Sequence, residues 1–155
     1  MLFLVAFVAA TFIFATCDDE LDANLPAGIQ TYISANYPGS TADEAEEETD
    51  CTGIAVYNVE LENEAEEDTE DTDIELSFDA DGNFLYSETD MATATLPATV
   101  TDAVTANYAS FTLKEASILT LADGSTQYEV EVKNGLDKRE VRITNEGVVV
   151  CEMAD

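Results

Sequence analysis

The sequence contains no histidine and very few basic residues. Of its 155 residues, 34 are Asp or Glu and only 5 are Lys or Arg, which gives a formal net charge of −29. The lack of histidine excludes reactions that use an imidazole as a general base, as the partner of a nucleophile or as a metal ligand. The excess of negative charge disfavours binding to nucleic acids and to anionic lipid surfaces.

The many acidic residues have two interpretations. They either solvate the protein surface in salty surroundings, or they cluster to bind a divalent cation such as calcium. The segment from Asp79 to Asn83 does not fit an EF-hand, because its glycine is the fourth residue and not the sixth. A hairpin turn is the better interpretation of this segment. Serine and threonine are abundant but have no basic partner, so we predict no catalytic residue, no metal ligand and no cofactor.

Cysteine is also scarce, with three residues in the chain. Cys17 directly follows an apolar run, which leaves Cys51 and Cys151 as a pair. Outside the cytoplasm these two residues can form a disulfide. The alternative is that both are free and act as small hydrophobic residues.

Residues 1–16 are apolar or small throughout, and the run ends at the acidic sequence that follows Cys17. The run is shorter than the roughly 20 apolar residues of a transmembrane helix, and it is typical of a signal peptide. Cys17 stands where a bacterial lipoprotein carries its lipid-modified cysteine, although no basic residue precedes the run and Phe14 replaces the usual leucine. The alternative is ordinary cleavage and release.

Residues 17–24 then form a polar, acidic tether. We therefore expect the protein in the cell envelope, attached to a membrane only through a lipid, or secreted, and not in the cytoplasm.

The chain repeats itself. The sequence from Leu25 to Tyr37 recurs from Leu96 to Tyr108, 71 residues later (96 − 25 = 71). The apolar residues of each copy recur at helical spacing and predict an amphipathic helix, which must bury its apolar stripe against another element.

Alternating apolar and polar residues predict four strands after each helix. In the second unit the predicted strands are residues 116–121, 127–133, 140–144 and 148–153. In the first unit they are residues 45–50, 57–62, 74–78 and 84–86, and the acidic 45–50 segment is expected to be short, frayed or at a sheet edge.

The predicted fold class is therefore α+β: a tandem duplication with units 25–90 and 91–155, which share a sheet. Each unit has one amphipathic helix packed on a four-stranded antiparallel sheet. All basic residues lie in the second unit. They are Lys114, Lys133, Lys138, Arg139 and Arg142.

These motifs resemble a known family. The Leu25–Pro26 start of the first helix, its Asn36–Gly39 end and the later segments 57–61 and 78–85 are similar to the beta-lactamase-inhibitor-like, PepSY-like domains of Bacteroidetes-type secreted proteins and lipoproteins. The second copy keeps most of them. The resemblance implies a helix on a four-stranded antiparallel sheet, used twice, and it carries no catalytic residues.

We therefore expect a non-enzymatic module that binds a protein or peptide, with an inhibitory or regulatory role, on the sheet face that the helices leave free. The alternative is weak calcium binding by clustered carboxylates. Five tyrosines are expected in the core. They are Tyr32, Tyr37, Tyr57, Tyr86 and Tyr128.

Overall fold

The computed structural model describes residues 25–63 and 74–154. The predicted signal peptide, the acidic tether and Cys17 lie outside these ranges and remain predictions. Within the described ranges, no helix has both the length and the apolar character needed to cross a membrane.

Two helices form where the repeated segments predict them. They are α1 (Ala27–Asn36) and α2 (Ala98–Asn107). Each begins directly after a proline, which lacks an N–H and is therefore well placed at a helix start. The carbonyl of Pro26 accepts the first helical hydrogen bond, from the Ile29 N–H at 2.9 Å.

Eight strands follow in two groups of four. In the first group they are β1 (Ser40–Thr49), β2 (Ala55–Asn63), β3 (Ile74–Asp79) and β4 (Phe84–Asp90). In the second they are β5 (Thr112–Leu121), β6 (Thr126–Asn134), β7 (Asp137–Thr144) and β8 (Val149–Ala154). A short 3₁₀ helix, η2 (Thr93–Thr95), precedes α2.

The eight strands form one antiparallel sheet in the order β1 to β8. The two units therefore share a sheet, as the repeat predicts, but each group contributes four strands to it and does not form a four-stranded sheet of its own. Strands β4 and β5 pair from Tyr86–Leu121 to Asp90–Ser117, so the backbone hydrogen bonds continue across the boundary between the two groups. The acidic strand β1 lies at the edge, as expected, but it is ten residues long and not short.

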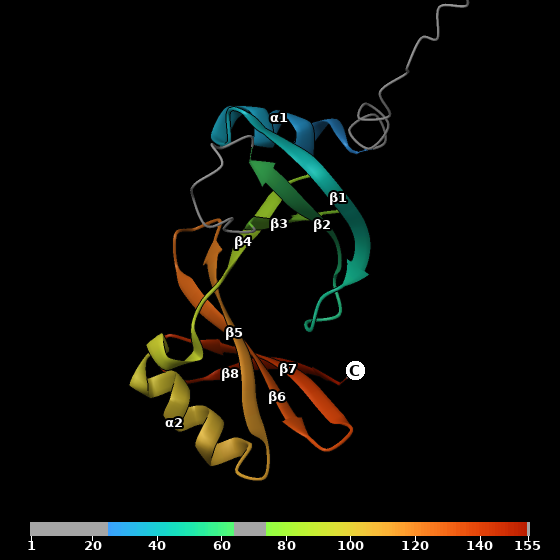
Figure 1. The fold of residues 1–155 in the computed structure, drawn as a ribbon. Coiled ribbons are helices and arrows are strands. Elements are labelled where there is room, and N and C mark those ends of the chain that lie inside the picture. Colours follow the sequence, from blue (N-terminus) through green and yellow to red (C-terminus); the bar gives the residue numbers. More distant parts are fainter. Residues whose placement is uncertain (1–24, 64–73, 155) are drawn as a thin grey trace, which may run out of the picture.

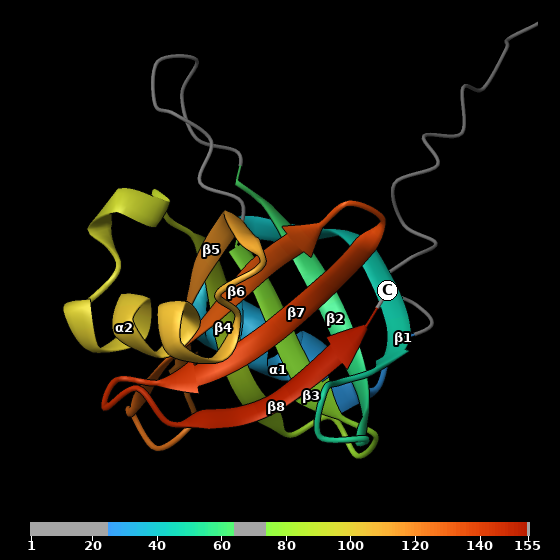
Figure 2. The same cartoon turned by 90° about the horizontal axis from the view of Figure 1, so that it is seen from below.

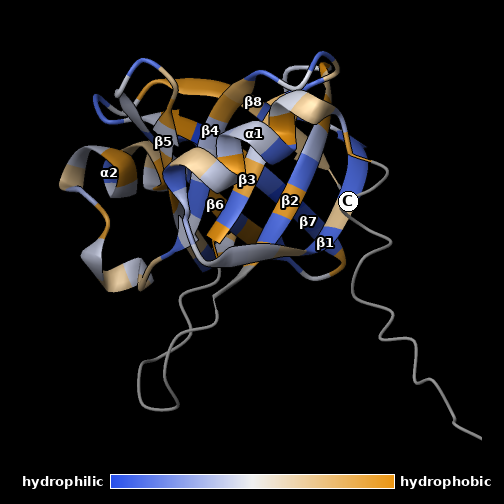
Figure 3. Cartoon of the chain, turned by 90° about the horizontal axis from the view of Figure 1, so that it is seen from above, coloured by the Kyte–Doolittle hydropathy of each residue, from blue (hydrophilic) through white to orange (hydrophobic). Residues whose placement is uncertain are grey.

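The sheet is strongly curled, and both helices lie on its outer side (Figures 1 and 2). Hydrophobic and hydrophilic residues alternate along β2 and β3 (Figure 3), and the hydrophobic ones pack with the buried residues of α1. The helices therefore leave the inner, concave side of the sheet uncovered.

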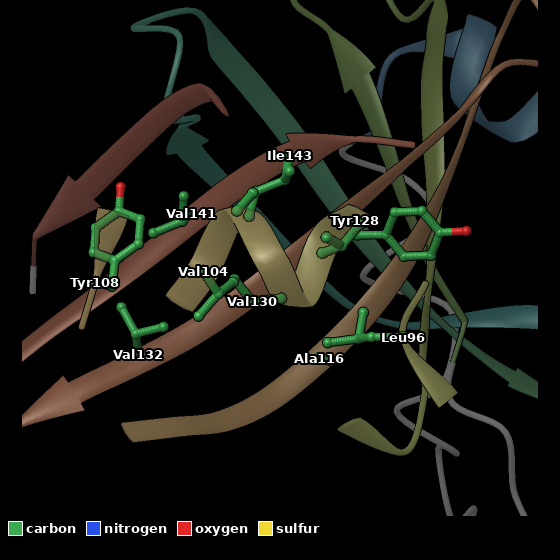
Figure 4. Packing of buried hydrophobic residues seen from close by; sticks show 11 residues of the cluster. Leu96, Val104, Tyr108, Ala116, Tyr128, Val130, Val132, Val141 and Ile143 are labelled. Carbon is green, nitrogen blue, oxygen red and sulfur yellow. The ribbon is translucent and has the colours of Figure 1, made fainter. Parts of the chain in front are cut away.

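Each helix covers its own hydrophobic cluster. The cluster beneath α2 includes Val104, Val130 and Ile143 (Figure 4). The cluster beneath α1 consists of Ile29, Ile33, Val59, Leu61, Leu76 and Phe78. One sheet thus supports two separate cores.

Candidate functional site: the concave acidic face

The inner side of the sheet, opposite the helices, is lined mainly by carboxylates. We call this surface the acidic face. It includes residues from both groups of strands, and it is hollowed in several places. The residues that line the hollows include Glu44, Glu46, Glu48, Asn58, Glu60, Glu75, Tyr86, Glu88, Asp90, Glu129, Glu131, Glu140 and Arg142.

Four glutamates stand side by side across the first group of strands. Glu44 pairs with Glu60, Glu60 with Glu75, and Glu75 with Glu88 in the strand register. We call these four residues the first glutamate row. Like charges directly opposite one another destabilise a sheet, so the first glutamate row destabilises the folded state.

Two members of this row have strongly raised pKa values. Burial and then the charges of neighbouring glutamates, Glu48 first, raise the pKa of Glu75 to about 7. Burial and then the charge of Glu129 raise the pKa of Glu88 to about 7. Both carboxyls are therefore partly protonated near neutral pH, and a nearby positive charge would favour their ionised form.

The second group of strands carries a matching row. Glu115 pairs with Glu131, Glu131 with Glu140, and Glu140 with Met153. The ammonium of Lys138 lies 3.1 Å from Glu131 and 3.4 Å from Glu140. The second row is thus partly neutralised and ends in a methionine.

Arg142 lies between the two rows. Its guanidinium donates to Oε2 of Glu129 at 3.0 and 3.2 Å and to the Tyr86 hydroxyl at 3.0 Å. It also lies 4.5 Å from the centre of the Tyr86 ring. Tyr86 is buried, as expected. It faces the acidic side, and the alternation in β7 already indicated that Arg142 points away from the helices.

The two cysteines outside the signal region are joined. Cys51, in the turn between β1 and β2, forms a disulfide with Cys151 of β8, with a Cα–Cα distance of 5.5 Å. The separation is 100 residues in sequence. Only the curl of the sheet, which brings its two edges together, makes this bond feasible.

The segment after β3 is a hairpin turn, as its sequence predicts. The carboxylate of Asp79 accepts the backbone N–H groups of Asp81 at 3.0 Å and Asn83 at 2.8 Å. The Asn83 side-chain amide also donates to this carboxylate, and its hydrogen bonds first, then the backbone ones, lower the pKa of Asp79. In the part of the chain that the structure describes, no three His, Cys, Asp or Glu residues are grouped to hold a metal ion. Calcium binding stays a prediction.

The predicted binding surface, the sheet face free of helices, is thus present and open, but it is charged. One of its hollows measures about 190 Å³ and has Arg142 in its wall. Another, of about 180 Å³, is lined by Glu60, Glu75, Glu88 and Asp90. Such a surface attracts positively charged groups, and its recesses are wide enough to admit side chains.

Similar structures come from Bacteroides species. A DUF2874 family protein from Bacteroides uniformis is 19% identical, with 84% of this chain and 89% of that chain covered and a TM-score of 0.58. A BLIP-like protein from Bacteroides fragilis is 24% identical, with 86% and 90% covered and a TM-score of 0.55. A Bacteroides eggerthii protein described as "putative periplasmic" is 17% identical, with 83% and 88% covered and a TM-score of 0.57. These likenesses show a shared fold.

A comparison with curated proteins finds no match. The family described as "Putative beta-lactamase-inhibitor-like, PepSY-like" matches the sequence twice, at residues 20–86 and 67–150. Together these matches span both helices and nearly the whole sheet, so the chain belongs to the PepSY-like family.

Proposed function

We propose that this protein is a non-enzymatic binding module of the cell envelope that takes a basic protein or peptide on its acidic face. The observation that carries the proposal is the first glutamate row. Its like charges oppose folding, and a segment rich in lysine or arginine would relieve that repulsion by placing a cation beside each carboxylate.

The family supports a binding role. Its description likens its members to a beta-lactamase inhibitor, a protein that acts by binding another protein. An envelope location agrees with the similar protein described as periplasmic and with the sequence of residues 1–24, in which Cys17 would carry the lipid. An inhibitory or regulatory role would follow if the bound protein were an enzyme.

We also infer that the two groups of strands arose by tandem duplication. The repeated sequence, the double match to the family and the separate core beneath each helix support this origin. Duplication explains why two glutamate rows lie at equivalent places. The binding surface would then be the product of two units joined along β4 and β5.

The test is a crosslinked pulldown of the tagged protein from the native cell envelope, at low and at high salt. The face variant is Glu60→Gln, Glu75→Gln and Glu88→Gln. The control variant removes the same three charges at exposed sites outside the described hollows, with Asp81→Asn, Asp102→Asn and Glu146→Gln. We expect a basic partner that the wild type and the control variant retain at low salt and that high salt releases.

The face variant should lose this partner. Equal recovery by the face variant and the wild type would contradict the proposal, because binding would then not depend on the acidic face. Retention of an acidic or uncharged partner would contradict its charge complementarity.

A further inference from the structure

The turn between β1 and β2 is fastened to the opposite edge of the sheet by two ties. Strands β1 and β8 are the two edge strands, which the curl brings to the same side of the molecule (Figure 2). The first tie is the disulfide between Cys51 in the turn and Cys151 in β8. Because the disulfide joins one edge to the other, it closes the curled sheet into a ring.

The second tie is the carboxylate of Asp50, which binds in two directions. One oxygen accepts the N–H groups of Thr52 at 2.9 Å and Ile54 at 3.2 Å and so shapes the turn. The other oxygen lies 3.5 Å from a guanidinium nitrogen of Arg142 on β7. The Asp50 and Arg142 side chains are each only 8% exposed, so this ion pair is shielded from solvent.

The two ties form a wall of the 190 Å³ hollow on the acidic face. Asp50 and Cys51 line it from the turn, and Glu75 and Glu88 line it from the central strands. Arg142 and Met153 line it from the far edge. The width of this hollow therefore depends on how firmly the turn is held against β7 and β8.

The two cores do not depend on these ties. The hydrophobic clusters lie beneath the helices, on the other side of the sheet. Strand β1 is paired with a neighbour on one side only, and its residues are mostly exposed. Loss of the disulfide would therefore loosen β1 and its turn more than the rest of the fold.

We propose that the Cys51–Cys151 disulfide is a redox-operated clasp that holds the acidic face in the shape that binds a basic partner. This inference rests on the proposed function and adds its regulation. In the oxidised protein the face is preorganised and binds more tightly. In the reduced protein the edges separate, the hollow widens and affinity falls.

The reducing agent is a dithiol. One of its thiolates attacks a sulfur of the Cys51–Cys151 bond and forms a mixed disulfide, and its second thiolate then displaces the remaining cysteine. Two electrons and two protons pass to Cys51 and Cys151, and the reagent leaves as a disulfide. Both cysteines are partly exposed, so a dithiol can reach the bond.

The first measurement is hydrogen exchange of the full protein with and without dithiothreitol. We expect reduction to speed amide exchange in residues 40–63 and 149–154, and to leave α2 and β6 unchanged. A Cys51→Ser, Cys151→Ser variant should show the amide exchange rates of the reduced protein, and dithiothreitol should not change them. Unchanged exchange on reduction would overturn the clasp, and so would loss of protection throughout the chain, which would make the disulfide a requirement for folding.

The second measurement is calorimetric binding of an oligolysine peptide to both redox forms. We expect the oxidised form to bind roughly fivefold or more tightly, because preorganisation lowers the cost of binding. Equal affinity of the two forms would overturn redox control of the face. A peptide that bound neither form would contradict the proposed function, while the exchange data would still decide whether the clasp opens.

Discussion

The two groups of strands share one plan but differ in charge. Each has a helix after Leu–Pro, four strands and a glutamate row at the same register positions. The first group has no basic residue, whereas the second contributes Lys138 to its own row and Arg142 to the centre of the face. The second row is therefore partly neutralised by a cation of its own group, whereas the first group of strands supplies no cation to its row.

Equivalent positions in β2–β3 and β6–β7 also differ in charge. Asn58 faces Ser77 across β2 and β3, and the serine hydroxyl donates to the amide oxygen at 2.6 Å. In the second group, Glu129 faces Arg142 at the corresponding place, and the guanidinium nitrogen lies 3.0 Å from the carboxylate. Equivalent places in the two groups thus hold a neutral pair in the first group and an ion pair in the second.

Both helices also dock in the same way on the last turn of their group. A Cβ on Gly28 of α1 would lie 2.8 Å from the carbonyl oxygen of Gly82. In the second group, a Cβ on Gly147 would lie 2.6 Å from the carbonyl oxygen of Thr99 in α2, and Gly147 adopts a φ of 81°. Close helix-to-turn approach is therefore common to both groups. Each turn carries a glycine with positive φ, Gly82 or Gly147, and the first group has Gly28 in its helix as well.

The largest expected effect on stability comes from truncating one large side chain in either hydrophobic cluster. Phe78→Ala, beneath α1, should lower the free energy of unfolding by about 3–5 kcal/mol, and the equivalent Ile143→Ala, beneath α2, by about 2–5 kcal/mol. Both residues are fully buried. Chemical denaturation should show a single transition for each variant, because β4 and β5 join the groups. Two transitions, with only one of them shifted, would show that the groups unfold independently.

The next effect comes from removing the central cation. Arg142→Met should lower the free energy of unfolding by about 2–4 kcal/mol, because Glu129 and Asp50 lose a shielded partner. Ser77→Ala, at the equivalent place, should cost only about 1 kcal/mol. Denaturation in urea compares the two variants. Equal losses would mean that the ion pair adds nothing beyond the neutral pair.

A pH dependence should distinguish the first row from the second. Glu75 and Glu88 titrate near 7 in the folded protein and at their lower ordinary values when unfolded. Between these values the folded state binds more protons, so stability falls as pH rises and is restored by acid. At pH 8, Glu75→Gln with Glu88→Gln should raise the free energy of unfolding by about 1–2 kcal/mol.

At pH below the ordinary glutamate range the same double variant should leave stability nearly unchanged. Denaturation at several pH values measures both effects. Asp102→Asn with Glu146→Gln removes two exposed charges elsewhere and should retain the pH dependence of the wild type. If the Glu75→Gln, Glu88→Gln variant kept the pH dependence of the wild type, that dependence would come from other titrating groups.

The smallest effect should come from the second row. Lys138→Met should lower the free energy of unfolding by about 0.5–1 kcal/mol, since its ion pairs are partly exposed. High salt should reduce this loss. Lys133→Met, at the exposed end of β6, is the matched control and should change stability less. Thermal unfolding at two salt concentrations is sufficient, and a loss independent of salt would argue against a charge effect.

Much of the fold could be predicted from the chain, because its signals are local. Leu96–Pro97 and the helical spacing that follows located α2, and alternation from Tyr128 to Val132 located β6. Strand β1 was expected to be weak because a run of glutamates has low strand propensity. It forms ten residues of strand because pairing with β2 supplies hydrogen bonds that propensity does not count.

The acidic face was harder to predict. Alternation correctly placed Glu60 and Glu75 away from the helices, but a single strand does not show which residues lie opposite one another. The raised pKa values of Glu75 and Glu88 follow first from burial and then from the charges of Glu48 and Glu129, which lie on other strands. Tyr86 is buried, as its residue type predicts, but the sequence did not show that its hydroxyl accepts a hydrogen bond from Arg142 on the acidic side.

By itself the sequence determined the repeat, the two helices, the alternating strands, the charge difference between the groups and the family. These features depend on residue type and short-range spacing, both of which can be read directly from the sequence. Only the tertiary structure decided the register in which β4 and β5 join the two groups, and that the sheet curls until Cys51 meets Cys151. Twist and pairing accumulate over many strands, so they bring together residues 100 positions apart that no local pattern relates.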